Sequence, residues 1–379
     1  PLKAYGKTTD LTAMGGAQYV HTFDKCFFMP SDLTAGLEYN RDRLKDNMWG
    51  YDRHTDQTVN IYSAFLQNEW KNDRWGILIG GRLDKHNMVD NVIFSPRANL
   101  RFNPTQNINL RLSYSSGFRA PQAFDEDMHI ENVGGTVAMI ERAKNLKEEK
   151  SQSFSASADM YHRFGVFQTN FLIEGFYTRL TDVFVLGEPY DRGDGILVKT
   201  RSNGPGAKVM GLTLEGKVAY LSILQIQAGL TLQRSRYDEP HKWHDDAPAE
   251  KKIFRTPDTY GYFTATYTPI KPLSIALSGT YTGRMLVQRM DITAENAELG
   301  AMPERKAEAI RTPRFFDLGV KLAYDFKLYK TVDLQLNGGV QKLFESYQKD
   351  FDRGANRDSG YIYGPSLPRS FFAGVKISY

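Results

Sequence analysis

The chain has 379 residues, enough for two or three soluble domains or for one large barrel. Its 48 basic and 44 acidic residues leave a net charge of +4, too balanced to indicate a nucleic-acid partner. The single cysteine, Cys26, excludes an intrachain disulfide framework, and no run approaches about 18 consecutive apolar residues, which excludes a transmembrane helix.

Segments with apolar residues at alternate positions recur along the whole chain, the first of them near residues 17–24. Because successive side chains of a strand point to opposite faces, each segment predicts a strand with one apolar face and one polar or small-residue face. Strands of about 9 to 11 residues match a tilted crossing of the hydrocarbon layer. The clearest later segments are 108–116, 165–178, 208–220, 223–233, 273–282, 316–326 and 332–341.

This alternation fits either the solvent face of a soluble sandwich or the wet lumen of a membrane barrel, and the connections separate the two. Short turns are predicted near 25–31, 71–73, 103–107, 161–165, 221–223, 269–272 and 327–331. Long polar segments lie between them, at 41–57, 87–95, 117–150, 181–206, 234–258, 284–314 and 345–370. Outer-membrane barrels alternate short periplasmic turns with long extracellular loops, whereas several loops beyond about 15 residues argue against a compact soluble domain. The predicted fold class is all-β, a transmembrane antiparallel β-barrel.

The last ten residues predict the closing strand of such a barrel. One of its faces is apolar throughout, from Phe371 to the terminal Tyr379. Aromatic residues form girdles at the lipid–water boundary of membrane barrels, which explains an aromatic anchor on the final residue.

About fifteen strands are predicted in total. An odd antiparallel set has two edges that run in the same direction, unlike the even-numbered bacterial barrels, and open edges in lipid leave backbone groups unpaired. We therefore expect a further N-terminal piece to supply the missing strands, with residues 1–10 in an extracellular loop.

Several segments, in this order and at these separations, resemble the TonB-dependent outer-membrane receptors, particularly those of Bacteroidetes type. They are 66–70 (Leu-Gln-Asn-Glu-Trp), 81–86 (Gly-Arg-Leu-Asp-Lys-His), 94–97 (Phe-Ser-Pro-Arg), 117–121 (Gly-Phe-Arg-Ala-Pro), 145–151 (Asn-Leu-Lys-Glu-Glu-Lys-Ser), 203–208 (Asn-Gly-Pro-Gly-Ala-Lys) and 363–369 (Tyr-Gly-Pro-Ser-Leu-Pro-Arg). The resemblance implies a 22-stranded barrel around an N-terminal plug. Residues 1–379 would be the C-terminal part of that barrel, with the plug and the TonB-binding segment expected before it.

The resemblance also implies function and partners. The family takes up scarce nutrients such as iron–siderophores, haem and cobalamin, and relatives import glycans or peptides, with energy supplied through the TonB complex. No cofactor and no enzymatic bond chemistry are expected. Other implied partners are the outer-membrane lipids, a possible surface lipoprotein, and the barrel-assembly machinery, to which Phe371 and Tyr379 would present the assembly signal. The alternative is a non-transporting surface barrel that acts in protein contact, as an adhesin or assembly subunit.

Two candidate residues follow from the family boxes. Arg119 lies just beyond a strand, where it could pair with plug carboxylates or meet an anionic ligand through its planar guanidinium. In haem receptors of this family a histidine lies between the Phe-Arg-Ala-Pro and Asn-Pro-Asn-Leu boxes. His129 occupies such an interval, although only Asn145 and Leu146 of the second box are present.

Two long loops supply the remaining candidates. Residues 241–244 (His-Lys-Trp-His) have carboxylates nearby, so Trp243 and His244 are ligand-binding candidates; a solvated loop is favoured over a metal site because no helix aligns the histidines. The 284–314 loop carries Met285 and Arg289, which could touch a ligand or a lipoprotein partner, although ordinary loop packing explains them equally well.

Overall fold

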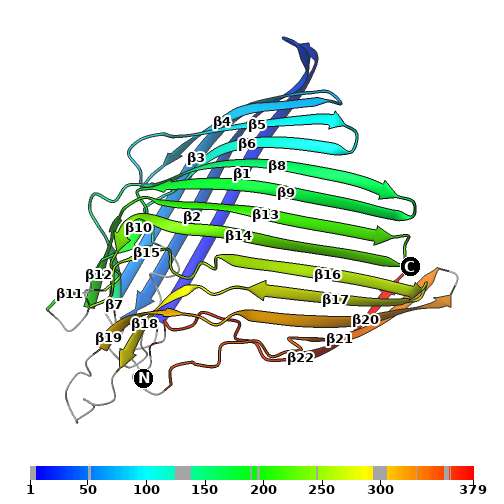
Figure 1. The fold of residues 1–379 in the computed structure, drawn as a ribbon. Coiled ribbons are helices and arrows are strands. Elements are labelled where there is room, and N and C mark those ends of the chain that lie inside the picture. Colours follow the sequence, from blue (N-terminus) through cyan, green and yellow to red (C-terminus); the bar gives the residue numbers. More distant parts are fainter. Residues whose placement is uncertain are drawn as a thin grey trace.

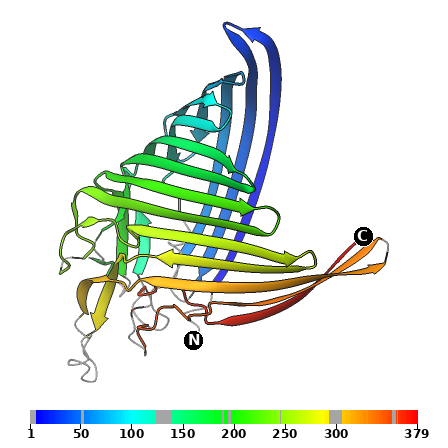
Figure 2. The same cartoon turned by 45° about the vertical axis from the view of Figure 1, so that its right-hand side comes forward.

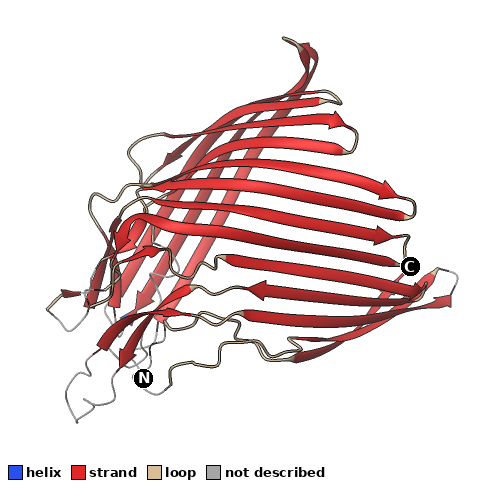
Figure 3. Cartoon of the chain, viewed as in Figure 1, coloured by secondary structure: helices blue, strands red, loops and turns tan. Residues whose placement is uncertain are grey.

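The computed structural model of the chain describes residues 6–49, 53–123, 138–187, 190–193, 197–244, 246–292, 305–329, 331–353, 358 and 360–379. Strands dominate these residues, and no helix among them is long and apolar enough to cross a membrane (Figure 3). The described residues form one large antiparallel sheet and two small sheets at its loop end.

The large sheet contains sixteen strands within the described residues. Fifteen of them follow one another in a single path, and β15 (Glu250–Lys252) pairs only with β14. The prediction of about fifteen strands is therefore confirmed. The path runs β1 (Gly6–Cys26), β2 (Met29–Met48), β3 (Arg53–Lys71), β4 (Trp75–His86), β5 (Ile93–Thr105), β6 (Ile108–Arg119), β8 (Glu149–Phe164), β9 (Phe167–Thr181), β13 (Ala207–Tyr220), β14 (Leu224–His241), β16 (Thr259–Ile270), β17 (Leu273–Thr282), β20 (Phe315–Tyr329), β21 (Val332–Gln341) and β22 (Ser370–Ser378).

The predicted alternation of short and long connections is confirmed from β4 onward. At one end of the sheet, neighbouring strands are joined by tight turns, such as 27–28 and 165–166, where Phe27 and Gly165 adopt positive φ. The long connections gather at the other end (Figure 1). They contain the two small sheets, formed by β7 (Ala138–Arg142), β10 (Phe184–Leu186), β11 (Tyr190–Asp191) and β12 (Leu197–Asn203), and by β18 (Leu286–Ile292) and β19 (Arg305–Arg311).

Two predicted boundaries were wrong at the start of the chain. The first strand begins at Gly6, so residues 6–10 belong to β1 and not to a loop, and most of the predicted 41–57 loop is strand. The reason is that the charged residues of this stretch pair across strands. Asp46, which is 3 % exposed, accepts a hydrogen bond from Arg53 at 2.7 Å and another from the Thr8 hydroxyl at 2.7 Å.

The sheet curves, so that β1–β3 pass behind the central strands in Figure 1 while β20 runs below β17, and the turned view shows an open trough (Figure 2). In the described residues β1 pairs only with β2, and β22 only with β21. The trough therefore has two open edges, as expected for part of a barrel.

The outer, convex face is apolar and carries two rows of aromatic rings. Along β8, β9 and β20 the aromatics of this face lie ten residues apart: Phe154 and Phe164, Phe167 and Tyr177, and Phe316 and Phe326. Ten residues of strand span about 33 Å, which a tilt of about 35–45° reduces to the height of about 25 Å typical of an apolar membrane band. These rows thus mark the two lipid–water boundaries.

Candidate functional site

The inner, concave face is polar along most of its strands. In β8 it carries Ser151, Ser153, Ser155 and Ser157, because alternate residues share a face. In β14 the same face carries Gln225, Gln227, Gly229, Thr231 and Gln233. Such a wall offers hydrogen-bond donors and acceptors to water or to a polar solute along its whole height.

Arg82 of β4 is the centre of a charge network on this wall. Its Nη1 lies 2.6 Å from Oε2 of Glu38 in β2, and its Nε donates to Oδ1 of Asp84 at 2.8 Å. Ser63 of β3 donates its hydroxyl to the same Asp84 oxygen at 2.6 Å. Asp84 is buried, whereas the side chains of Arg82 and Glu38 are each 37 % exposed. Arg82 is therefore paired with both carboxylates, and the three side chains together carry a formal charge of −1.

Two cavities adjoin this network. One, of about 520 Å³, is lined in part by Glu38, Arg82 and Arg97, and the other, of about 340 Å³, in part by Arg82 and Asp84. Arg97 of β5 is exposed and makes no ion pair with any residue that the structure describes. Arg97 gives this part of the wall a guanidinium that can hold an anionic group, because guanidinium geometry matches carboxylate and phosphate.

Aromatic rings on the inner face lie flat over glycines of the neighbouring strand. Phe65 occupies the space that a Cβ on Gly36 would need, and an added Cβ would lie 2.5 Å from Phe176 at Gly211 and 2.6 Å from Tyr262 at Gly229. Phe372 covers Gly339 in the same way. These rings fill gaps along the wall and leave the lumen wide.

At the loop end of the sheet, β7 and β12 from two long connections pair with each other in parallel. Arg142 anchors them, donating to Oε1 of Gln57 at 3.1 Å and to the Pro121 carbonyl at 2.9 Å. His86, fully buried beneath, accepts the Met88 N–H at 3.0 Å through Nδ1. Burial lowers the pKa of His86, which favours the neutral ring.

The last long connection is fixed by one carboxylate. Asp350 accepts the hydroxyl of Tyr361 at 2.9 Å and that of Tyr363 at 2.5 Å. Burial and the bond to Asp350 raise the pKa of Tyr361 to about 12 and raise that of Tyr363 further. Burial raises the pKa of Asp350, but the two phenol hydrogen bonds outweigh it and the net shift is downward. Buried Gln348 ties the same segment together, donating to the Tyr361 carbonyl at 2.9 Å.

Arg119, predicted to pair with a plug carboxylate or an anionic ligand, has a partner within its own sheet. Its Nη1 lies 3.8 Å from Oε2 of Glu149, the directly opposite residue in β8, and its guanidinium lies 5.7 Å from the ring centroid of Phe184. Glu149 also accepts the Phe184 backbone N–H. Arg119 thus joins the rim of the barrel to the loop sheet, and its ligand role stays a prediction.

Trp243 and His244 lie in a loop, as predicted. Their ring centroids are 5.9 Å apart, and the Trp243 ring also meets Phe254 edge-on. His244 Nδ1 accepts the Asp246 backbone N–H at 3.3 Å. No three histidine, cysteine or acidic side chains of the described residues are arranged to hold a metal ion, and Asp245 lies outside those residues.

Met285 and Arg289 are both engaged by their own chain. Met285 is 7 % exposed and packs in a cluster with Val287 and Tyr361, so it offers little surface to a ligand in this conformation. Arg289 pairs with Asp352 at 2.9 Å and lies 5.0 Å from the Tyr361 ring centroid. The loop-packing interpretation of these two residues therefore has direct contacts to support it.

The remaining candidates concern haem and assembly. His129 lies outside the described residues. Phe371 and Tyr379 are highly exposed, and Phe371 lies on the apolar face opposite Val340. Their role as an assembly signal stays a prediction.

Sequence reasoning missed the Arg82 network. Residues 81–86 were noted only as a family box, although Arg82 and Asp84 occupy alternate positions of a strand and so share its lumen face. Glu38 is far away in sequence, and only the β2–β3–β4 register brings it beside Arg82.

Comparison with known families agrees with this geometry. The family described as TonB-dependent receptor-like β-barrel matches residues 3–341, and the chain belongs to this family. Its members are outer-membrane proteins of Gram-negative bacteria, and this chain is therefore an outer-membrane protein. A search among curated proteins gives no match.

Solved structures with the same fold include three receptors of low sequence identity. The siderophore receptor PirA from Acinetobacter baumannii is 16 % identical with a TM-score of 0.66, over 98 % of this chain and 55 % of that one. A mutant of the ferric enterobactin receptor PfeA from Pseudomonas aeruginosa is 18 % identical with a TM-score of 0.69, over 98 % and 54 %. The ferric-catecholate import receptor Fiu from E. coli K12 is 15 % identical with a TM-score of 0.66, over 98 % and 55 %. The chain thus spans about half the length of these proteins.

Proposed function

We propose that this chain is the barrel part of an outer-membrane receptor that imports a scarce nutrient chelate, of the ferric siderophore class, with energy transmitted by TonB. The match of the family over residues 3–341 carries the proposal. The names of the similar structures, which include siderophore, ferric enterobactin and ferric-catecholate receptors, favour the siderophore class over haem and cobalamin.

The chemistry of the inner wall supports the same class of cargo. Catecholate and carboxylate chelates of iron are anionic, and Arg97, which makes no ion pair within the described residues, presents its guanidinium beside the 520 Å³ cavity. In this proposal the wall binds and passes the chelate without making or breaking bonds, so the chain is not an enzyme. The plug and the TonB contact are contributed by the half of the receptor that this chain does not cover.

The test is growth of a strain that lacks the gene on one limiting source at a time: a ferric catecholate siderophore, haem or cobalamin. We expect a defect on the siderophore alone, restored by the complete gene in a cell with TonB and not in a cell without it. Normal growth on all three sources would contradict the proposal. If cell-surface attachment were lost at the same time, the result would instead favour the non-transporting surface barrel.

A second test separates Arg97 from a matched arginine on the same strand and face. Arg101 is held against the wall, donating to the Asn72 carbonyl at 3.0 Å. Arg97 makes no ion pair with any residue that the structure describes, so its guanidinium can contact a ligand. We expect Arg97→Ala to raise the KM for ferric siderophore uptake about tenfold, the scale of one charged contact, and Arg101→Ala to leave it nearly unchanged. Equal effects of the two variants would contradict a direct contact with Arg97.

A further inference from the structure

Three cations lie directly opposite one another on the outer face of the sheet. Lys208 of β13 pairs in register with Arg179 of β9 on one side and with Arg236 of β14 on the other. Directly opposed side chains in a sheet have Cβ atoms about 5 Å apart, and like charges so placed destabilise it. A nearby anion would therefore reduce the repulsion within this row of cations.

The protein supplies only part of that anionic charge. The two Asp238 oxygens lie 2.8 and 2.7 Å from the Arg179 guanidinium, and one is 4.0 Å from Lys208 Nζ. Arg234, two residues from Arg236 on the same face, is exposed and makes no ion pair within the part of the chain that the structure describes. Arg234 and Arg236 thus make no ion pair with any residue that the structure describes.

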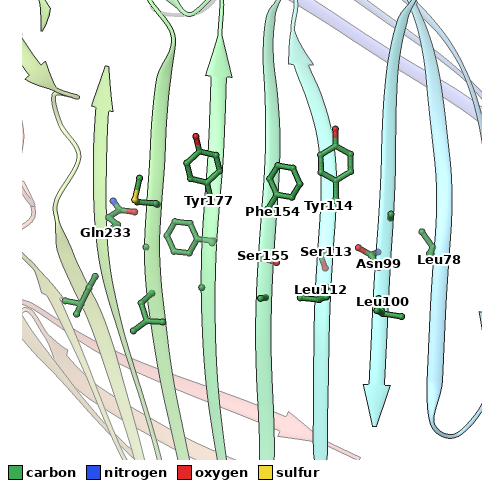
Figure 4. Close-up of a pocket in the computed structure, with 18 of the residues that line it drawn as sticks. Leu78, Asn99, Leu100, Leu112, Ser113, Tyr114, Phe154, Ser155, Tyr177 and Gln233 are labelled. Carbon is green, nitrogen blue, oxygen red and sulfur yellow. The ribbon is translucent and has the colours of Figure 1, made fainter. Parts of the chain in front are cut away.

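An apolar groove lies directly below the cations on the same face. Its volume is about 1120 Å³, and Arg234 is among the residues that line it. Tyr114, Phe154 and Tyr177 form a row of rings across neighbouring strands at the upper end of the groove (Figure 4). Its floor is made of the small residues Ala98, Ala156 and Gly175, and a Cβ at Gly175 would meet nothing within 4 Å.

The order of these features matches an amphiphile in a membrane. The aromatic row marks the lipid–water boundary, the groove lies in the apolar band, and the cations stand outside it on the loop side, which is the outer leaflet. A volume above the usual range of about 300–1,000 Å³ for small-molecule pockets leaves room for more than one acyl chain.

We propose that Arg234, Lys208 and Arg236, together with the groove that contains Gly175, bind a phosphorylated glycolipid of the outer leaflet. Its phosphates lie against the cation row and its acyl chains in the groove. A phospholipid with a single phosphate and two acyl chains pairs with fewer of the cations and fills less of the groove, and therefore binds more weakly. This site is on the opposite face of the sheet from the lumen and is independent of the transported cargo.

The experiment uses the complete gene product, purified in mild detergent and stripped of lipid, with native mass spectrometry as the measurement. The probes are diphosphorylated hexa-acyl lipid A, the same lipid without phosphates, and phosphatidylglycerol. We expect tight binding of the diphosphorylated lipid, and binding at least about tenfold weaker for the other two probes and for the Arg234→Ala/Arg236→Ala variant. Equal binding of lipid A with and without phosphates would overturn the proposal.

Matched controls separate the site from general effects. Arg311→Ala/Arg314→Ala removes two exposed cations of another long connection, and Gly216→Leu fills an equally open position on the same apolar face outside the groove. We expect both to bind as the wild type does, whereas Gly175→Leu loses affinity. Weakening by Arg311→Ala/Arg314→Ala as large as that by the Arg234→Ala/Arg236→Ala variant would overturn the proposal, even if Gly175→Leu fails to fold.

Discussion

The two faces of the same sheet treat charge in opposite ways. On the inner face, buried or half-buried carboxylates are matched: Asp84 by Arg82 and Ser63, and Asp46 by Arg53 and Thr8. On the outer face, Lys208 lies between two arginines with one carboxylate nearby. The inner face thus supplies donors for these carboxylates from its own residues, whereas the outer face above the membrane carries an excess of positive charge. The difference indicates that the positive charge of the outer face is balanced by anions from its surroundings.

The largest effect is expected from breaking an inner ion pair and comparing it with an outer one on the same two strands. Asp46→Ala removes the carboxylate that pairs with Arg53, whose side chain is 8 % exposed, and should cost about 3–5 kcal/mol. Asp56→Ala, on the outer face, breaks contacts to Arg43 and Lys45 at a site 55 % exposed, and should cost about 0–1 kcal/mol. Urea unfolding followed by heat-modifiable gel mobility measures both, and equal costs would contradict the contrast.

A smaller effect is expected from the glycines beneath the inner aromatic rings. Gly36→Ala places a methyl group where the Phe65 ring lies, and overpacking of this kind costs about 1–3 kcal/mol. The double variant with Phe65→Ala should lose this penalty, which a double-mutant cycle reports directly. Gly15→Ala, on the outer face with open space around the added atom, is the control. No coupling between positions 36 and 65 would show that the ring does not hold its place over Gly36.

The smallest effect concerns pH and the last long connection. The pKa of Asp350 is lowered, so its contribution to stability is full above the ordinary carboxyl value and is lost as pH falls through the lowered pKa. The pKa of Tyr361 is raised to about 12, so its contribution is full below the ordinary phenol value and is lost as pH rises through about 12. Proteolysis of residues 345–369 should therefore be constant between about pH 5 and pH 9. Tyrosinate absorbance should contain a late component that Tyr361→Phe/Tyr363→Phe removes.

Much of the fold could be predicted because the strands of a membrane barrel have apolar residues at alternate positions and because its short and long connections alternate along the chain. The fifteen-strand path and the apolar last strand followed from that pattern. The early boundaries did not, because charged residues such as Asp46 and Arg53 look like a loop until the register pairs them.

The candidate site was less predictable, because sequence reasoning placed ligand residues in the loops and could not see which of them bind each other. Met285 and Arg289 are occupied by their own loop neighbours. Arg82 and Glu38, in contrast, meet only through the pairing of three strands. Contacts between strands that are distant in sequence depend on the register of the sheet, and a local sequence motif does not predict that register.

The length of β2 and β3 limits which deletions the loop end of these two strands can accept. Their ladder continues without interruption from Ser31 opposite Trp70 to Met48 opposite Arg53, so the rim there is a stiff ribbon. Removal of one residue from a strand would turn every side chain beyond it to the other face. A deletion in β2 would move Asp46 to the outer face, and a deletion in β3 would move Asp56 to the lumen face. Shortening of this ribbon must therefore proceed by two residues at a time and in both strands together.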